Sequence, residues 1–212
     1  MSSAKGVYQG RVGIVSTPDE KLAIELLRRQ AYERAAEFSI LKSSAYSWDE
    51  DDNLGYVLGV WDKDRNALAT MRGIVAAGRT EAEDHFECSV PLEGSYFPSL
   101  LLGRGATLVN RSSVGLNSLL RYHFFEAAIQ MDLHSVLGAV FDGAPRIRLL
   151  KSLGYEFRKP DRVWDENLKI RSPILIASLR QDDFCRARTL LIETVERLFH
   201  EFPWEGATIS RS

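Results

Sequence analysis

One stretch of the 212-residue chain, Leu100–Phe157, constrains the fold more than any other. It opens within an apolar run, Ser99–Val109, bounded by polar residues as a buried strand would be. Apolar side chains then recur at helical spacing over Leu116–Met131, and a second apolar strand is predicted at Ser135–Phe141. A short helix, Arg146–Ser152, follows and stops before a glycine. Two strands joined by a helix of this length are expected to run side by side and parallel.

Two features of this stretch point to a ligand. Gly103 and Gly105 interrupt the first strand, and glycine inside a strand often marks a β-bulge or a close approach by a ligand. Ser112 or Ser113 is suited to cap the following helix, and Gly115 lies directly before it. The free backbone N–H groups and the positive dipole at the start of that helix can hold a phosphate.

The order of these elements resembles the donor-binding half of the GNAT (N-acetyltransferase-like) superfamily. There the phosphate turn reads Arg/Gln-x-x-Gly-x-Gly/Ala; this chain has Ser112–Asn117, with Gly115 kept and the first and last positions changed. The ending Leu153-Gly154-Tyr155 is also similar. The resemblance implies an α/β (α+β) fold with a mixed, mostly antiparallel central sheet flanked by helices. It further implies a thioester donor on a pantetheine arm and no tightly bound cofactor. The expected donor-binding residues are Arg111, Ser112, Ser113, Gly115, Asn117, Arg148 and Lys151.

The N-terminal half narrows the resemblance. A helix is predicted over Leu22–Phe38, an acidic segment follows at Trp48–Asp52, and two strands are predicted at Gly55–Trp61 and Ala67–Ala76 as a hairpin. Acyl-homoserine-lactone synthases and the related long-chain N-acyl amino acid synthases show a similar series of features. The former also carry Glu-x-Ser-Arg on the fourth strand; this chain has Leu101–Arg104, which keeps only the Arg and favours the latter branch. The matching residues are Arg34, Phe38, Trp48, Asp49, Asp52 and Arg72.

Forming an amide from a thioester requires a deprotonated amine, a polarised carbonyl and a fixed attack geometry. The resemblance makes Asp49 and Asp52 the candidate bases. In the resembling fold a bulged strand offers a backbone N–H to the reacting carbonyl, and Gly103–Ala106, which includes Arg104 and Gly105, is the expected place. The Arg104 side chain would recognise a carboxylate or the carrier arm. Tyr155 is a candidate proton donor to the leaving thiolate, although a tyrosine at such a position usually packs. Two other acids are alternatives for the base, Glu87 and Glu93.

The acceptor residues also have plain structural interpretations. Arg104 lies in an apolar strand, and a buried arginine needs partners, so it can belong to a structural ion pair. The acids at Asp49 and Asp52 can form a solvated charge run, and Phe38 and Trp48 can be core aromatics. The residues that the resemblance places around the acceptor are Arg34, Phe38, Trp48 and Arg72.

Charge is unevenly distributed along the chain. Residues 37–93 hold 12 acids and 5 Lys/Arg (net −7), whereas residues 111–162 hold 8 Lys/Arg and 5 acids (net +3). The whole chain has a net charge of −2, so nothing favours nucleic acid as a partner. Surface scatter would explain the asymmetry, but a basic face that receives an acidic acyl carrier protein would also do so. That face would contain Arg111, Arg121, Arg146, Arg148 and Lys151.

Other motifs are absent or incomplete. Cys88 and Cys185 form no metal or redox motif, the acids at 49–53 lack the glycine and glutamate of a calcium loop, and no metal site is expected. Residues 1–6 have no apolar core and no apolar run is long enough for a transmembrane span, so neither a signal peptide nor a span is expected, and a cytoplasmic protein is expected. A single domain over residues 1–212 is expected, in which 161–212 form a strand–helix extension. Residues 80–95 are predicted to be irregular.

The sequence therefore supports three hypotheses about function. The first is an N-acyltransferase that moves a long-chain acyl group from acyl carrier protein or acyl-CoA to a small-molecule amine such as an amino acid. The second is an acetyl-CoA-dependent small-molecule N-acetyltransferase, against which the changed phosphate turn argues, because Ser112 stands where Arg or Gln is usual. The third is a non-catalytic sensor that binds an acyl carrier.

Overall fold

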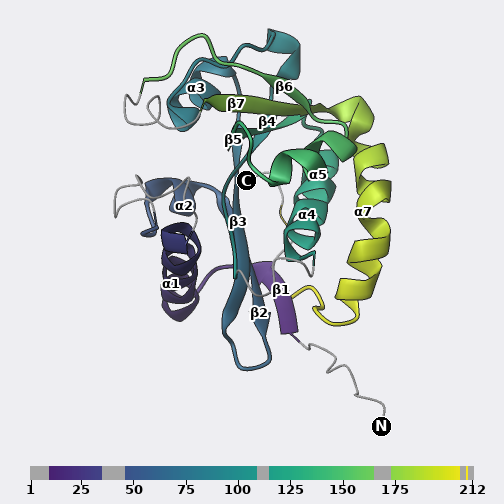
Figure 1. Ribbon diagram of the computed structural model, residues 1–212. Helices are drawn as coiled ribbons and strands as arrows, with labels where there is room; N and C mark the ends of the chain where they lie inside the picture. Colours follow the sequence, from purple (N-terminus) through teal and green to yellow (C-terminus); the bar gives the residue numbers. More distant parts are fainter. Residues whose placement is uncertain (1–9, 35–45, 109–114, 165–172, 206–208, 210–212) are drawn as a thin grey trace.

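The computed structural model describes residues 10–34, 46–108, 115–164, 173–205 and 209. In these residues seven strands form one sheet in the order β1-β2-β3-β4-β5-β7-β6 (Figure 1). Among these seven strands only β4 and β5 pair in parallel, so the predicted mixed, mostly antiparallel sheet is confirmed. The strands are β1 (Gly10–Ile14), β2 (Tyr56–Asp62), β3 (Ala67–Ala76), β4 (Ser99–Thr107), β5 (Ser135–Phe141), β6 (Glu156–Arg158) and β7 (Ile174–Arg180). The helices are α1 (Pro18–Arg34), α2 (Glu50–Leu54), α3 (Arg79–Phe86), α4 (Leu116–Gln130), α5 (Arg146–Ser152) and α7 (Phe184–Phe199), with short 3-10 turns at Gly94–Tyr96 and Gln181–Asp183.

Helices cover both faces of the sheet: α1, α2 and α3 lie on one side, and α4, α5 and α7 lie on the other (Figure 1). The alternation of side chains along β4 explains this arrangement. Leu100 and Leu102 belong to the core cluster that contains Phe124 of α4. Leu101, between them, belongs to the cluster that contains Phe86 of α3. A strand that is apolar on both faces therefore needs a helix layer on each side.

The predicted order of elements around β4 and β5 is confirmed. Strand β5 has the expected bounds, β4 ends at Thr107, and residues 109–114 lie outside the described residues. Helix α4 begins at Leu116 as expected because Gly115, at φ +79°, turns the chain into it. The predicted hairpin is also present, since β2 and β3 pair antiparallel from Tyr56 to Trp61.

The prediction of irregular structure over residues 80–95 is wrong for its first half, because Arg79–Phe86 forms α3. Ala82 and Phe86 lie one turn apart and are both buried, so this mostly polar helix has one apolar stripe. At its start the Glu81 carboxylate accepts a hydrogen bond from the backbone N–H of Ala77 at 2.8 Å. The stripe is too short for sequence periodicity to reveal, and its burial depends on the sheet beneath it.

The C-terminal strand and helix pack onto the rest of the chain. Strand β7 lies between β5 and β6 and pairs with β5 along its whole length, from Ile174 to Arg180. The strand was expected at 168–179, and residues 165–172 lie outside the described residues. Helix α7 packs on α4 and buries Phe184, Leu191 and Leu198. Within the described residues, no helix has the length and apolar character needed to cross a membrane.

Candidate active site

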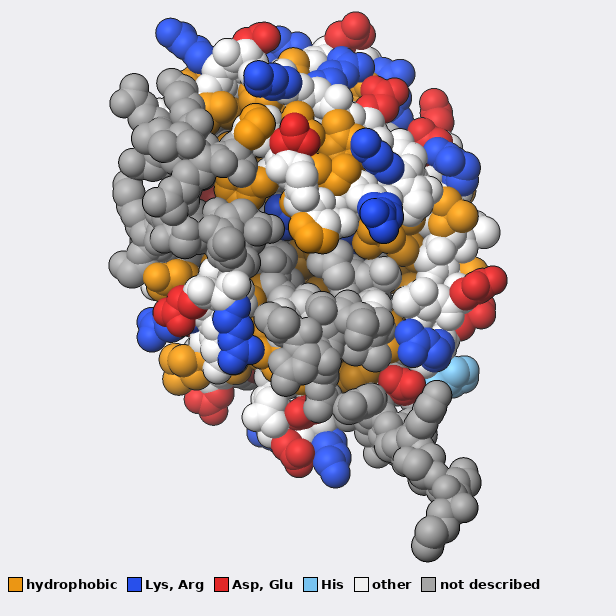
Figure 2. All heavy atoms as spheres, viewed as in Figure 1, with side chains coloured by type: hydrophobic (Ala, Val, Ile, Leu, Met, Phe, Trp, Pro, Cys, Tyr) orange, Lys and Arg blue, Asp and Glu red, His pale blue; other side chains and the backbone are white. Residues whose placement is uncertain are grey.

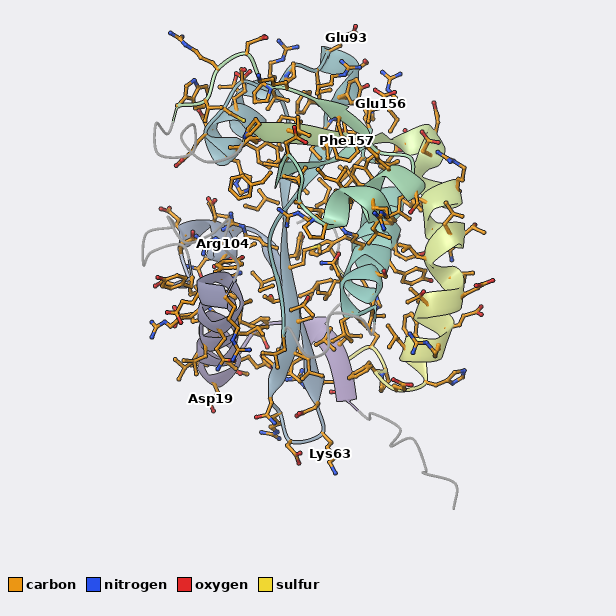
Figure 3. All side chains as sticks on the ribbon, in the orientation of Figure 1. Asp19, Lys63, Glu93, Arg104, Glu156 and Phe157 are labelled. Atoms are coloured by element: carbon orange, nitrogen blue, oxygen red, sulfur yellow. The ribbon has the colours of Figure 1, made fainter. Side chains whose placement is uncertain are left out.

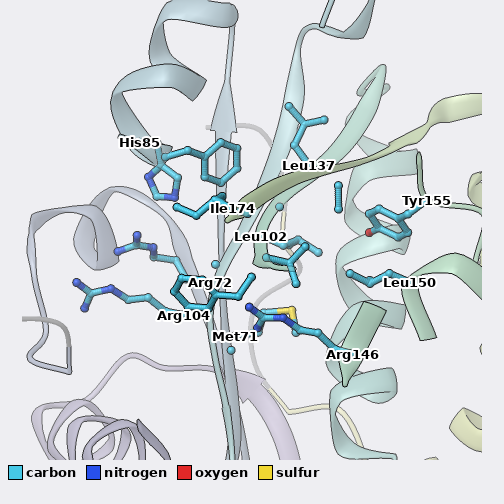
Figure 4. A pocket seen from close by; sticks show the side chains of 18 of the residues that line it. Met71, Arg72, His85, Leu102, Arg104, Leu137, Arg146, Leu150, Tyr155 and Ile174 are labelled. Carbon is cyan, nitrogen blue, oxygen red and sulfur yellow. The ribbon is translucent and has the colours of Figure 1, made fainter. Parts of the chain in front are cut away.

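A cavity opens where β4 and β5 separate. The two strands pair only at their first three residues, Ser99–Leu101 with Ser135–Leu137, and then diverge. Beyond this point β5 stays paired with β7, so the gap lies on the β4 side. The cavity has a volume of about 350 Å³ (Figure 4). Its apolar lining includes Leu102, Leu137, Val140, Phe141, Leu150, Ile174 and Ala177, and its polar lining includes Tyr32, Arg72, His85, Glu87, Arg104, Asn117, Arg121, Arg146 and Tyr155.

The edge of the cavity on β4 is a β-bulge. Thr70 pairs with Ala106 and Arg72 pairs with Gly103, so β4 has one residue more than β3 in this interval. Within the bulge Arg104 has a φ of +49°, a left-handed conformation that costs a non-glycine residue about 1–2 kcal/mol. Arg104 and Gly105 both line the cavity. The two glycines in the strand pattern thus marked the place where the ladder is interrupted beside a ligand-sized space.

Helices α1 and α2 meet at a fully buried ion pair. The Arg28 guanidinium donates two hydrogen bonds, of 2.6 and 2.8 Å, to the two carboxylate oxygens of Asp52. Both side chains have no exposed surface. Burial alone would raise the pKa of Asp52, but the hydrogen bonds and charge of Arg28 and the charges of Arg72 and Arg104 lower it below its ordinary value. Asp52 is therefore ionised at neutral pH and holds a proton only weakly.

The same acidic segment holds the two arginines of β3 and β4. Asp49 caps α2 by accepting the backbone N–H of Asp52, and its carboxylate also pairs with Arg72 at 3.1 Å and with Arg104 at 2.5 Å. Arg72 also reaches Asp51 at 3.2 Å, and Arg104 donates to the carbonyl of Ser47 at 2.7 Å. Figure 3 shows Arg104 extending from the sheet toward α1 and α2. We call Arg28, Asp49, Asp51, Asp52, Arg72 and Arg104 the ion cluster.

The structure brings most of the expected acceptor and catalytic residues together, although not all at the cavity. Arg72, Arg104 and Gly105 line it, whereas Asp49 and Asp52 lie behind Arg72 and Arg104 as their partners. The contacts of the two carboxylates thus favour a positioning role over a proton-accepting one. Two others do not line the cavity: Arg34 is exposed at the end of α1, and the Trp48 indole donates to Asn53 at 2.8 Å. Phe38 lies outside the described residues.

The structure describes some of the expected donor-binding residues. Asn117 lines the cavity at the start of α4, directly after the left-handed Gly115. Arg148 and Lys151 are exposed on α5. Arg121, expected on the basic surface, is instead only 7% exposed and lines the cavity, where its Nε–H donates to Asn117 at 2.9 Å. A long arginine on an otherwise apolar helix looks the same in sequence whether it faces solvent or a cavity. Arg111, Ser112 and Ser113 lie outside the described residues.

Sequence reasoning missed His85 as a site residue. Its side chain is 9% exposed and lines the cavity from α3, and its Nδ1 lies 3.1 Å from the Asp51 carboxylate. No sequence signal could have placed it, because the four histidines share no spacing and α3 itself was not expected. Tyr155, weighed as a proton donor, also lines the cavity; burial raises its pKa to about 12, against the opposing charge of Arg121. Among the described residues, no group of three or more His, Cys, Asp or Glu is arranged to hold a metal.

The sheet order, the bulged β4 and the opening between β4 and β5 define the class: the chain has the fold of the GNAT acyltransferases. Among solved structures it is similar to BjaI, a CoA-dependent acyl-homoserine lactone synthase (TM-score 0.59, 10% identity, 93% of this chain and 94% of that chain). It is also similar to FeeM, an N-acyl amino acid synthase from uncultured soil microbes (TM-score 0.56, 13% identity, 88% and 98%). A third is the ribosomal-protein-S5-alanine acetyltransferase from Vibrio fischeri (TM-score 0.53, 15% identity, 87% and 98%). No protein-family model and no curated protein sequence matches the chain.

Proposed function

We propose that this chain is an N-acyltransferase that moves a long-chain acyl group from a pantetheine thioester, carried by an acyl carrier protein, to the amine of an amino acid or a similar small molecule. One observation carries the proposal: a cavity of about 350 Å³ in the opening between β4 and β5, lined by apolar side chains and by several arginines. Pockets of this size and mixed character bind small organic ligands. The likeness to an N-acyl amino acid synthase and to an acyl-homoserine lactone synthase supports the same class of reaction.

On the donor side, the gap between the strands provides a slot for the pantetheine arm. An extended arm between β4 and β5 would bring its thioester to the bulge at Arg104 and Gly105. The bulge leaves β4 backbone groups outside the ladder, and a backbone N–H there would stabilise the oxygen of the tetrahedral intermediate. The start of α4, at Gly115 and Asn117, would receive the phosphate.

On the acceptor side, the ion cluster fixes the arginines. Arg72 and Arg104 are each held by two or more carboxylates, which restricts their side chains before any substrate arrives. We assign Asp49 and Asp52 to this positioning role. Tyr155 remains protonated at neutral pH because burial raises its pKa to about 12, and its hydroxyl can supply a proton to the leaving thiolate.

The surface beside the cavity fits an acidic carrier. Helix α5 exposes Arg148 and Lys151, while Arg146 on the same helix lines the cavity. Figure 2 shows Lys and Arg side chains over this part of the molecule. Attraction between this helix and an acidic carrier would increase the association rate and weaken with salt.

Two measurements test the function. Purified protein is incubated with a long-chain acyl carrier protein or with acetyl-CoA and a panel of amino acids, and the products are identified by mass spectrometry. We expect long-chain N-acyl amides from the wild type and from Ala77→Phe, an exposed control, and their loss in Ala139→Phe, which fills the cavity. Turnover of acetyl-CoA alone would favour a small-molecule acetyltransferase, and carrier binding without any product would favour a sensor.

The carrier is tested by charge reversal. Arg148→Glu with Lys151→Glu should raise the KM for the acylated carrier and leave the KM for a free pantetheine thioester unchanged. Lys63→Glu, at the tip of the β2–β3 hairpin far from α5, is the matched control (Figure 3). Equal effects on both donors would contradict docking through α5.

A further inference from the structure

We propose that His85 is the base that takes the proton from the acceptor ammonium, and that Asp51 is the positioning residue that orients it. This inference rests on the proposed acyltransfer and names a catalytic group for it. His85 belongs to α3 and lines the cavity, while Asp51 belongs to α2. The base would thus come from an element outside the Leu100–Phe157 stretch that holds the donor.

The geometry leaves one ring nitrogen for chemistry. His85 Nδ1 lies 3.1 Å from a carboxylate oxygen of Asp51. The other nitrogen, Nε2, lies 3.7 Å from the point where a β-carbon on Gly103 would stand, directly before the bulge on β4. Figure 4 shows His85 at the edge of the cavity near Arg72, on the side opposite Tyr155. The free nitrogen is therefore next to the place where the thioester carbonyl would lie.

The chemistry of Asp51 sets the tautomer. An ionised carboxylate can only accept hydrogen bonds, so the Nδ1 that contacts it carries the hydrogen. The lone pair of the neutral ring is then on Nε2, the nitrogen near β4. Because Asp51 also pairs with Arg72 at 3.2 Å, its carboxylate is fixed from a second direction.

The surroundings keep this histidine neutral. Burial lowers its pKa and the charge of Arg72 lowers it further, while the hydrogen bond and charge of Asp51 and the charge of Asp49 act against them. The net pKa is below the ordinary value, so the ring is unprotonated at pH 7 and can accept a proton. Glu87, which follows α3, also lines the cavity.

Two other acids near the cavity, Asp52 and Asp49, are less suited to the role. Asp52 is fully buried against Arg28, and its lowered pKa makes it a weak base. Asp49 is engaged as a helix cap and as the partner of both Arg72 and Arg104. His85 combines a place on the cavity wall with an uncommitted nitrogen.

The proton balance of the step is complete. The acceptor ammonium transfers one proton to Nε2 of His85, and the resulting amine attacks the thioester carbonyl. A C–N bond forms and the C–S bond breaks. The second proton leaves the nitrogen as the amide forms, and the thiolate takes up one proton, which Tyr155 can relay. The proton on His85 is released to solvent, so one proton is produced for each ammonium consumed.

The test compares His85→Gln, Asp51→Asn and the exposed control His134→Gln, each first checked for an unchanged melting temperature. We expect His85→Gln to lower kcat by about 10²–10⁴-fold with an ammonium acceptor, with little change in KM. With hydroxylamine, which is neutral at pH 7, the loss should be much smaller. Asp51→Asn should move the acidic limb of the pH profile of kcat/KM. His134→Gln should neither lower kcat nor move this profile. If the His85→Gln enzyme is as active as the wild type with an ammonium acceptor, the proposal that His85 is the base is refuted.

A second measurement does not depend on turnover. Nitrogen-15 NMR of the His85 ring should show a neutral ring at pH 7 with hydrogen on Nδ1, and Asp51→Asn should change this tautomer population. Hydrogen on Nε2, or a charged ring at pH 7, would refute the proposal even in an active enzyme. If the wild type transfers no acyl group to any amine, the proposed function fails and the base fails with it. If transfer occurs but survives His85→Gln, only the base fails.

Discussion

Replacing Asp52 with asparagine should destabilise the protein strongly. The Asp52 carboxylate accepts two hydrogen bonds from Arg28, at 2.6 and 2.8 Å, and neither side chain has any exposed surface. An asparagine would leave the buried guanidinium without its counter-charge, a change that typically costs about 3–5 kcal/mol. A domain of this size loses roughly 2–4 °C of melting temperature per kcal/mol, so the expected loss is on the order of 6–20 °C.

Urea denaturation followed by circular dichroism measures this change in the free energy of unfolding. Asp64→Asn removes an exposed carboxylate at the hairpin turn and should stay within about 0.5 kcal/mol of the wild type. The double variant Arg28→Met with Asp52→Leu removes both charges and should recover much of the loss, because no charge is then buried alone. A loss below about 1 kcal/mol for Asp52→Asn would refute the reasoning.

The ion pair also predicts an acid limit. The folded-state pKa of Asp52 is below its ordinary value, so the unfolded chain takes up the proton first as pH falls. The stability from this pair is therefore fully present above the unfolded pKa of about 4 and is lost as pH falls through the folded value. Asp52→Asn should flatten the pH dependence of stability in this acid range.

Three further predictions concern other positions in the chain. Gly115→Ala should cost more stability than Gly143→Ala: both have a positive φ (79° and 83°), but only at Gly115 would a β-carbon lie 2.4 Å from another side chain. Burial lowers the pKa of His123 to about 4, so the unfolded state binds its proton first and stability should fall by roughly 2 kcal/mol from pH 7 to 5; His123→Phe should remove that part. Cys88, whose pKa burial raises to about 11, should react with a thiol reagent only after unfolding, and the exposed Cys185 should react at once.

Each of these has a control within the chain. Thr194→Ala should relieve part of the Gly115→Ala loss, because the clash is with the Thr194 methyl group. His134→Gln, at an exposed site, should keep the wild-type slope between pH 7 and 5, and the lowered pKa of His85 should leave a residual slope in His123→Phe. A flat wild-type profile, or two thiols that react equally fast in the folded state, would contradict the assigned burial.

The elements that were predicted well from the sequence are those in which a long pattern of apolar residues lies within the segment itself. Ser135–Phe141 is a continuous apolar run, and Leu116–Gln130 repeats apolar residues at helical spacing, so neither depends on knowing the neighbours. Helix α3 was missed because its apolar stripe is only Ala82 and Phe86. Its stability comes from packing on β3 and on a buried cluster that includes Leu101 of β4, and a local sequence pattern does not show such contacts.

The same distinction applies to the candidate site. Gly103 and Gly105 predicted the bulge, because the residues that interrupt a strand belong to the sequence of that strand. The gathering of Asp49, Asp52, Arg72 and Arg104 was expected from resemblance and is seen in the ion cluster. Which of these side chains reaches the cavity could not be predicted. That outcome depends on Arg28 of α1, which occupies both oxygens of Asp52 and turns this acid away from the cavity.

Because the charges within the ion cluster pair with one another, the cluster attracts an anionic substrate group only weakly. Its three arginines face three aspartates, so the cluster contributes little net charge to the cavity. Arg121, on the opposite wall, donates its Nε–H to the neutral amide of Asn117, and its charge is not consumed in that bond. Attraction of a carboxylate or phosphate should therefore come mainly from the α4 side. The ion cluster would instead form a rigid wall of the cavity. This wall would keep the neutral His85 ring at a fixed distance from the bulged strand.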